Sequence, residues 1–169
     1  MFNPIMRLEI RALNKEVNKF LKQFEVDARL GTNFSYYYSL GRIEYTIFAA
    51  SAADKAFMNH FNKLSNGRIV CDVFLASLLH EVGHHLTLDS FSEEEELENY
   101  DRVMDLQAKI DFAETEAEEE QIRIEYMSLP VEMAATKWAI DYMLNNAEEV
   151  GKAWKKIQRA IKRFRKYAK

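Results

Sequence analysis

The chain has 169 residues, of which 48% are hydrophobic and 30% charged, and its net charge is −4. These values are ordinary for one soluble globular domain, or one domain with an extra helix, and the length suffices for a core without disulfide or metal staples. The single cysteine, Cys71, excludes an internal disulfide framework and a cysteine-rich zinc site, so a metal would have to be held by histidine and carboxylate.

The small net charge hides two segments of opposite sign. Residues 93–120 contain thirteen acidic residues against Arg102 and Lys109, whereas residues 152–169 contain nine basic residues and no acidic one. No stretch approaches the roughly 20 apolar residues of a membrane span, and the N-terminus lacks a signal-peptide core. We therefore expect a cytoplasmic protein without a transmembrane segment.

Only two prolines and five glycines interrupt the sequence, which predicts a mostly helical chain. Apolar residues at helical spacing predict a first amphipathic helix over about 4–24. The following aromatic and β-branched segment predicts two or three short antiparallel strands, with a turn at 40–42. Residues 54–64 then predict a helix capped by Asp54.

The second half predicts four further helical regions. A helix capped by Asp72 runs to Leu86, and its apolar residues surround most of the axis, which is typical of a buried central helix. The acidic segment 93–123 keeps apolar residues at helical spacing and predicts a helix or helical hairpin. A helix capped by Ser128, with Pro130 in its first turn, extends to about 146, and the last helix covers 149–167.

The buried helix carries the strongest chemical signal of the chain. His80, Glu81 and His84 form the pattern H-E-x-x-H, and residues four apart on a helix lie one above the other, so the two imidazoles converge. Two imidazoles and one further ligand leave tetrahedral Zn²⁺ a fourth position for water. Glu81 is then placed to accept the proton of that water, while Gly83 allows another backbone to come close.

The third ligand must come from another part of the chain. Glu132 lies near the start of a predicted helix whose same face continues with Ala135 and Ala139, and these small residues would allow close packing against the histidine helix. The alternative is that Glu132 only stabilises the first helical turn. His60 is the remaining histidine, and we expect a surface or packing role for it.

The segments "HEVGHH" and "PVEMAATKWA" together resemble the ImmA/IrrE-type zinc peptidases, whose H-E-x-x-H-H is followed by a helix with E-x-x-A-x-x-[aromatic]-A. The resemblance covers about residues 34–145. It implies a zincin-like α+β fold, mostly helical, with a small antiparallel sheet packed on the central HExxH helix. It also implies a gluzincin that binds one Zn²⁺ through His80, His84 and Glu132, uses Glu81 as general base, and cleaves a protein such as a repressor.

In domain terms, the resemblance implies a metallopeptidase domain over 1–148, including the N-terminal helix 1–24 and an acidic helical insertion at 93–123. The basic helix 149–169 follows it. The sequence departs from the family pattern in the long gap between His84 and Glu132, which the acidic insertion fills. The sequence also departs from the family pattern after Trp138, where Asp141 and Tyr142 replace the residues that end the family's motif.

Peptide cleavage also requires a surface for the substrate and a second oxyanion donor. Residues 42–49 are the candidate exposed edge strand, with Tyr45 and Ile47 as candidate substrate-binding residues. Tyr126 and Tyr142 are candidate donors to the transition state, among several tyrosines that the sequence does not distinguish.

The basic segment 152–169 predicts a cationic amphipathic helix. Its apolar face packs on the domain in the simplest interpretation, and its bases could contact nucleic acid, an anionic membrane surface or an acidic partner. For the whole chain, two functions remain open. One is a zinc metallopeptidase, and the other is a non-catalytic regulatory or binding protein on a metallopeptidase-like fold.

Overall fold

A computed structural model describes residues 4–47 and 52–167 of the chain. By its internal contacts the chain divides into two compact units, 1–48 with 142–169 (unit 1) and 49–141 (unit 2). The described residues contain seven α-helices and a three-stranded sheet, a mostly helical α+β fold as predicted. No described helix combines the length and the apolar character needed to cross a membrane.

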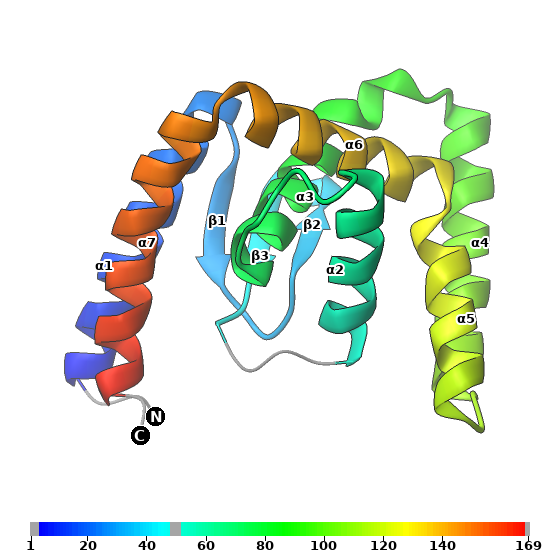
Figure 1. Cartoon of the computed structure of the whole chain (residues 1–169), viewed down its shortest axis with the longest axis horizontal. Coiled ribbons are helices and arrows are strands. Elements are labelled where there is room, and N and C mark those ends of the chain that lie inside the picture. Colours follow the sequence, from blue (N-terminus) through cyan, green and yellow to red (C-terminus); the bar gives the residue numbers. More distant parts are fainter. Residues whose placement is uncertain (1–3, 48–51, 168–169) are drawn as a thin grey trace. The chain divides into compact units, whose positions relative to one another are not determined.

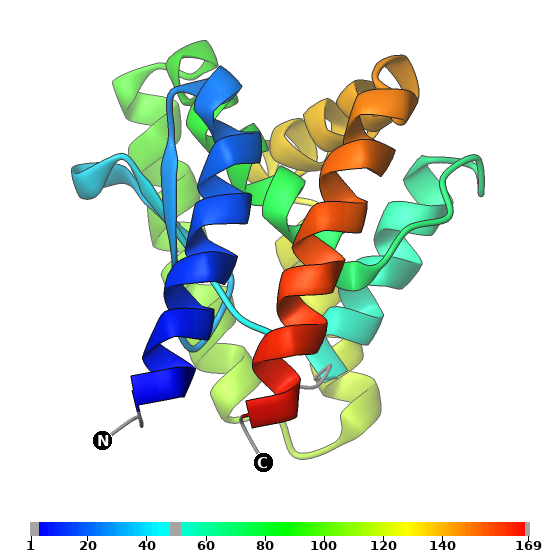
Figure 2. The ribbon, with the colours of Figure 1, turned by 90° about the vertical axis from the view of Figure 1, so that its left-hand side faces the viewer.

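Unit 1 is built on an antiparallel pair of long helices, α1 (Pro4–Leu21) and α7 (Ala147–Tyr167), which lie side by side in Figures 1 and 2. Each helix buries one apolar stripe, with Leu13 and Val17 on α1 and Ile157 and Phe164 on α7. The expected packing of the last helix through its apolar face is therefore confirmed. The predicted first helix is also confirmed, although its last residues form the 3-10 helix η1 (Lys22–Phe24).

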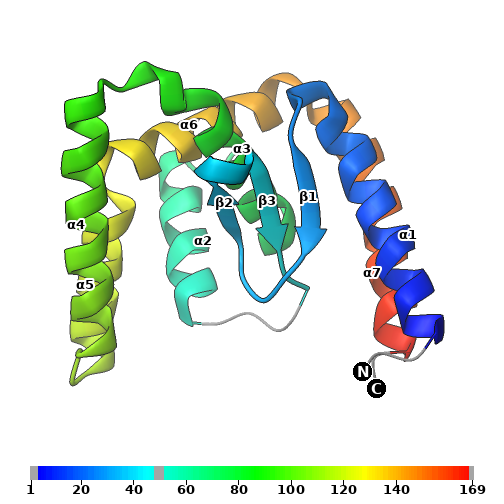
Figure 3. The same cartoon turned by 180° about the vertical axis from the view of Figure 1, so that it is seen from behind.

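The sheet consists of β1 (Asp27–Leu30), β2 (Ser35–Tyr37) and β3 (Arg42–Tyr45) in the order β1-β3-β2, as Figure 3 shows. β2 and β3 are antiparallel, but β1 and β3 are parallel. The prediction of an antiparallel sheet is therefore wrong for one of the two pairings. The tight turn was correctly placed, since η2 (Tyr38–Leu40) ends at Gly41 with φ +53°. After the turn, β3 lies between β1 and β2. Its pairing with β1 joins residues far apart in the sequence, and the turn does not determine it.

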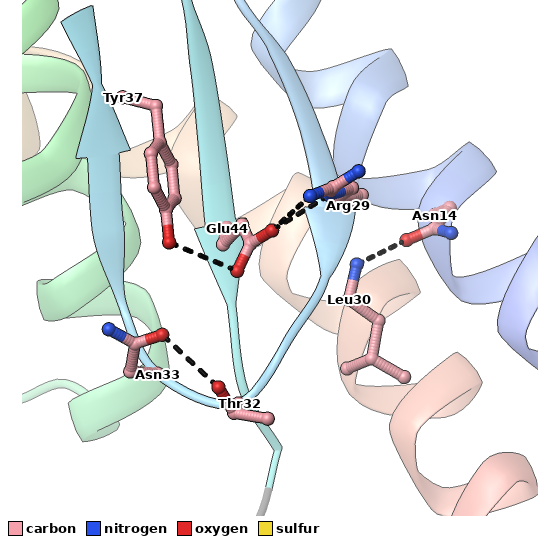
Figure 4. A network of polar contacts seen from close by, with 7 residues as sticks. All are labelled: Asn14, Arg29, Leu30, Thr32, Asn33, Tyr37 and Glu44. Carbon is pink, nitrogen blue, oxygen red and sulfur yellow. Dashed lines mark hydrogen bonds and ion pairs between the residues drawn. The ribbon is translucent and has the colours of Figure 1, made fainter.

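Two asparagines of α1 bind the outer edge of β1. Asn18 accepts a hydrogen bond from the Ala28 amide (2.6 Å) and donates one to the Ala28 carbonyl (2.7 Å). One turn earlier, Asn14 Oδ1 accepts from the Leu30 amide (3.0 Å), as drawn in Figure 4, and from the Tyr45 hydroxyl (2.6 Å). These side chains satisfy backbone groups that a neighbouring strand would otherwise pair with.

Figure 4 also shows that Glu44 on the central strand contacts both neighbouring strands, through an ion pair with β1 and a hydrogen bond from β2. Glu44 accepts a hydrogen bond from Arg29 Nε of β1 (2.8 Å) and a long one from the Tyr37 hydroxyl of β2 (3.4 Å). Gly31 lies directly over this side chain, because a Cβ there would come within 2.6 Å of Glu44 Oε2. The cross-strand contacts support the register in which β3 is central.

Unit 2 contains α2 (Ala52–Leu64), α3 (Val73–Thr87), the 3-10 helix η3 (Leu88–Ser90), α4 (Glu93–Asp111), α5 (Glu116–Met127) and most of α6 (Pro130–Asn145). The acidic segment forms a helical hairpin, as predicted, with α4 and α5 side by side in Figures 1 and 3. A capping box of Ser92 and Glu95 starts α4, and α5 also packs against α2.

Two predicted helix caps are wrong. Helix α2 already begins at Ala52, so Asp54 lies within the helix instead of before it. Ser128 ends α5, where its hydroxyl donates to the Ile124 carbonyl (2.7 Å), and α6 begins two residues later at Pro130. In both cases a residue type that favours caps lies within a turn of the helix boundary, but the neighbouring residues decide where the boundary falls.

Candidate metal centre

The H-E-x-x-H segment lies in the middle of α3, as predicted. Asp72 caps this helix by accepting a hydrogen bond from the Phe74 amide (2.9 Å), and residues 74–84 are buried without interruption. His80, Glu81 and His84 are 8%, 8% and 9% exposed. The two imidazole rings are 4.6 Å apart between centroids, and their Nε2 atoms are 3.1 Å apart. The helical spacing alone therefore brings the two nitrogens together.

Glu132 reaches the same point from the first turn of α6 and is 7% exposed. Its Oε2 lies 3.1 Å from His80 Nε2 and 3.4 Å from His84 Nε2. Among the described residues, these three side chains form a buried group that could hold one metal ion. The sequence therefore identified the three residues that the structure brings together.

The spacing of the three atoms fits a tetrahedral metal. Four ligands at about 2.05 Å from a zinc ion lie about 3.3 Å from one another in a regular tetrahedron. The edges of the triangle formed by His80 Nε2, His84 Nε2 and Glu132 Oε2 are 3.1, 3.1 and 3.4 Å. Three ligands of the types that zinc prefers thus occupy one face of such a tetrahedron, and the donor set fits Zn²⁺.

Close packing of α3 on α6 makes this convergence possible. A Cβ at Gly83 would lie 2.7 Å from the Cα and 2.9 Å from the carbonyl carbon of Ala135, and closer still to its carbonyl oxygen. Such contacts are prohibitive because they involve backbone atoms. Ala135, which faces Gly83, is fully buried, and so is Ala139 one turn later on α6. The expected close approach is confirmed for Gly83 and Ala135, whereas a contact of Ala139 with α3 stays a prediction.

Thr136 is a residue of the site that sequence reasoning missed. It is 2% exposed, and its hydroxyl oxygen lies 3.0 Å from His80 Nδ1. If His80 Nδ1–H donates to this hydroxyl, the lone pair of Nε2 is left free for a metal, the arrangement in which a second partner orients a ligating histidine. Thr136 follows Glu132 by four residues on the same helix face, a spacing that could have indicated it.

The electrostatics of the triad couple its members strongly. Burial by itself would raise the pKa of Glu132, but hydrogen bonds and charge interactions with His80 and His84 outweigh it and lower the pKa well below its usual range. Burial would likewise lower the pKa of His84, but the hydrogen bond and charge of Glu132, together with the charge of Glu81, raise it overall. The site therefore favours an ionised carboxylate beside the imidazoles, and Glu81 acts on the same histidine.

His60 lies outside the triad but within its electrostatic reach. Burial, and then the charges of Lys63 and His80, lower the pKa of His60. Among the described residues, its Nε2 atom is buried and has no hydrogen-bond partner. Phe57, one turn before His60, contacts the His80 ring at 5.2 Å between centroids. α2 thus places the Phe57 ring against the first histidine of the motif and carries a second imidazole on which the charge of His80 acts.

The structure does not support the predicted substrate strand. β3 is the central strand and is paired on both sides, so the expectation of an exposed edge strand at 42–49 is wrong for 42–45. Residues 46–47 lie in no strand, and 48–49 lie outside the described residues. Tyr45 is fully buried with its hydroxyl on Asn14, and Ile47 is buried as well. The substrate-binding role of these two residues loses its basis, because neither presents a side chain to the surface.

The two tyrosines proposed as transition-state donors lie in different parts of the chain. The Tyr142 hydroxyl donates to Gln23 Oε1 (3.1 Å) and the ring packs edge-on against Phe24, so this side chain is engaged within unit 1. Tyr126 is half-buried near the end of α5. Its role as a donor stays a prediction.

No family model, curated protein or solved structure matches this chain.

Proposed function

We propose that the chain is a zinc-dependent metallopeptidase that hydrolyses a peptide bond in a specific protein partner. The observation that carries this proposal is the buried triangle of two imidazole nitrogens and one carboxylate oxygen, with edges that suit one tetrahedral ion. Three protein ligands leave a fourth position open, which is typical of catalytic zinc sites, whereas structural sites have four.

The roles of the residues follow from their positions. His80, His84 and Glu132 would hold the ion, and the Thr136 hydroxyl would keep the His80 ring in its ligating orientation. Zinc bound there would lower the pKa of a water molecule and polarise the scissile carbonyl. Glu81, which follows His80 directly and is also buried, would take the proton of the attacking water and deliver it to the leaving amine.

We propose His60, in addition to Tyr126, as a candidate second donor to the transition state. Its Nε2 has no hydrogen-bond partner among the described residues and would donate a hydrogen bond to the oxyanion of a bound substrate, and the charge of His80 acts on it. The hydrogen bond from Tyr142 to Gln23 argues against Tyr142 as this donor. A His60→Phe variant is expected to lower kcat while the metal content stays unchanged, which separates this role from ligation.

The family assignment rests on the motif and its order along the chain. H-E-x-x-H on one buried helix, followed by E-x-x-A on a helix packed closely against it, is the arrangement of the ImmA/IrrE-type peptidases that the sequence resembles. The α4–α5 hairpin occupies the gap of 48 residues between His84 and Glu132. By this resemblance, the proposed substrate is a repressor or another regulatory protein.

The alternative function is a binding or regulatory protein that uses the same site without cleavage. The buried Glu81 argues against it, because a structural metal site has no use for a general base next to its ligand and a buried carboxylate is costly.

The first test is the metal content. Protein purified without added metal is analysed by mass spectrometry for wild type, Glu132→Ala and the exposed control Glu120→Ala. We expect about one zinc per chain in the wild type and the control, with most of it lost in Glu132→Ala. A wild type without stoichiometric metal would overturn the proposal, and zinc retained in Glu132→Ala would move the third ligand elsewhere.

The second test separates the two functions. Wild type, Glu81→Gln and the exposed control Glu98→Gln are incubated with a proteome-derived peptide library, and new termini are identified by mass spectrometry. Loss of the general base is expected to slow cleavage by about 10²–10⁴-fold with zinc retained. Unchanged cleavage by Glu81→Gln would refute the mechanism, whereas zinc without any cleavage by the wild type would favour the binding protein.

A further inference from the structure

The charge of the chain is divided between its two units. Unit 1 contains sixteen basic and seven acidic residues, a net charge of +9, whereas unit 2 contains seven basic and twenty acidic residues, a net charge of −13. Most of the positive charge lies on the two long helices of unit 1. The sequence indicated only the last of these helices as a basic surface, but the structure shows that its packing partner is basic as well.

Helix α1 carries a stripe of exposed bases on the part of its surface that does not pack. Arg7, Arg11, Lys15 and Lys19 follow one another at intervals of four residues, and Lys22 continues the series. Each interval corresponds to a rise of about 6 Å, so the first four charges extend over about 18 Å along one side of the helix.

Helix α7 carries a second series. Seven of its eight exposed bases recur every three or four residues, at Lys152, Lys155, Lys156, Arg159, Lys162, Arg163 and Lys166. The opposite stripe, with Ile157, Ile161 and Phe164, is buried. Because α1 and α7 are packed side by side and antiparallel, as Figure 2 shows, both basic series belong to one rigid helix pair.

Few of these charges are neutralised within the described residues. Arg163 forms a long ion pair with Glu9 of α1 (3.7 Å), and Lys152 pairs with Glu148 one turn earlier. Neither the α1 stripe nor the run Lys155–Lys162 on α7 has an ion pair in the described part of the chain. Self-repulsion among so many uncompensated charges opposes compactness, and an external polyanion relieves it.

We propose that the paired helices α1 and α7 form a binding surface for the phosphate backbone of duplex nucleic acid. Charges repeated at one-turn intervals along two rigid helices suit a continuous polyanion, and phosphate contacts of this kind bind without reading base sequence. A membrane surface fits less well, because an interfacial helix must offer an apolar face, whereas that of α7 is buried and α7 packs against α1. This proposal does not depend on the peptidase activity.

The test measures the affinity of the full-length protein for a fluorescein-labelled short DNA duplex of arbitrary sequence, by fluorescence anisotropy. With six or more phosphate contacts, the affinity should fall by about 10³-fold or more between roughly 50 and 200 mM salt. A second duplex of unrelated sequence should bind with equal affinity. Absence of binding at low salt, or a dependence on one sequence, would overturn the proposal.

Three triple variants, each removing three exposed positive charges, locate the surface. The α1 variant combines Arg11→Gln, Lys15→Gln and Lys19→Gln. The α7 variant combines Lys155→Gln, Arg159→Gln and Lys162→Gln. The matched control in unit 2 combines Lys55→Gln, Lys63→Gln and Arg68→Gln.

Both helix variants are expected to reduce the slope of log affinity against log salt by about three, whereas the control should leave it nearly unchanged. Equal losses in all three variants would show only an effect of net charge and overturn the surface. An α1 variant with the salt dependence of the wild type would restrict binding to α7 and refute the two-helix site.

The other possible occupants are tested with phosphatidylserine vesicles, with polyglutamate and by sedimentation at low salt. Tighter binding to vesicles than to DNA would indicate a membrane surface, and tighter binding to polyglutamate would indicate an acidic protein. Self-association that these variants abolish would indicate a second copy of the chain. Each of these results would overturn the nucleic-acid proposal.

Discussion

Two helix pairs of this protein differ in the kind of side chain that they bury. In α1 and α7 the apolar residues face inward and the charged ones outward, which is the ordinary pattern of amphipathic helices. In α3 and α6 the buried contact contains His80, Glu81, His84 and Glu132, four ionisable side chains at positions where a core would normally hold leucine.

The difference separates a pair with ordinary amphipathic packing from a pair whose buried side chains include ionisable groups. Buried ionisable groups lose hydration, and apolar residues of similar size at such positions are often as stabilising or more so. A helix pair that accepts this cost, and also needs a glycine to bring its backbones together, departs from ordinary packing at the place where a functional site is expected. Each of the following experiments acts on one side of this comparison.

The largest effect is expected from Gly83→Ala. The new methyl group would collide with the Ala135 backbone, so α3 and α6 must move apart, at a cost of about 3 kcal/mol in the free energy of unfolding and with loss of the bound metal. Gly151→Ala in α7 is the control, because a Cβ there meets nothing within 4 Å. That change should stabilise the helix by about 0.5–1 kcal/mol. Urea denaturation measures both, and an unaffected Gly83→Ala would contradict the close approach.

Removal of the metal comes next. A chelator should lower the free energy of unfolding by about 2.7 kcal/mol, if free zinc before chelation is at a hundred times its dissociation constant. Thermal unfolding with and without chelator measures this shift. A protein in which His80, His84 and Glu132 do not bind metal would unfold at the same temperature in both conditions.

The dependence of stability on pH should reverse with metal. In the chelated protein, the raised pKa of His84 gives a stabilisation that is complete below its ordinary value of 6.5 and lost as the pH rises through its folded-state pKa. The lowered pKa of Glu132 gives a second stabilisation, which is present above pH 4.5 and lost on acidification. Chelated protein should therefore lose stability as the pH rises above 6.5. Zinc-loaded protein should gain it, because protons compete with the metal for its ligands.

A smaller effect is expected from Thr136→Val, which keeps the volume but removes the hydroxyl next to His80 Nδ1. Loss of such an orienting partner typically weakens metal affinity by about 10–100-fold. Thr136→Ser should preserve the affinity, since the hydroxyl remains. Competition with a fluorescent zinc chelator measures both variants, and equal affinities for Val and wild type would show that the ring needs no second partner.

The smallest of these effects concerns unit 1. Asn18→Ala removes both hydrogen bonds to Ala28 and should cost about 1–2 kcal/mol in the free energy of unfolding, without any change in metal content. Asn33→Ala is the control, because Asn33 is exposed and its only hydrogen bond among the described residues is a long contact with Thr32 (3.4 Å). If Asn18→Ala changed the metal content, the packing of α1 on β1 would not be independent of metal binding at α3 and α6.

Much of the candidate site could be predicted because its signals are local. A spacing of four residues on a helix places His80 Nε2 and His84 Nε2 together whatever surrounds them, and Asp72 caps α3 through a hydrogen bond two residues away. Glu132 was harder to identify among many acids, and the small residues on its helix face were the signal. Thr136 was missed because its only signal was its position four residues after Glu132 on the same helix face, and that position indicates a partner of His80 only once Glu132 is known to lie beside His80.

By itself, the sequence determined the helices, the convergence of the two histidines, the acidic hairpin and the amphipathic last helix, since each follows from spacing within one element. Only the tertiary structure decided that β3 lies between β1 and β2, that Asn14 and Asn18 bind the edge of β1, and that the basic helices α1 and α7 are partners. These features depend on contacts between residues far apart in the chain, and the same local patterns are compatible with several such pairings.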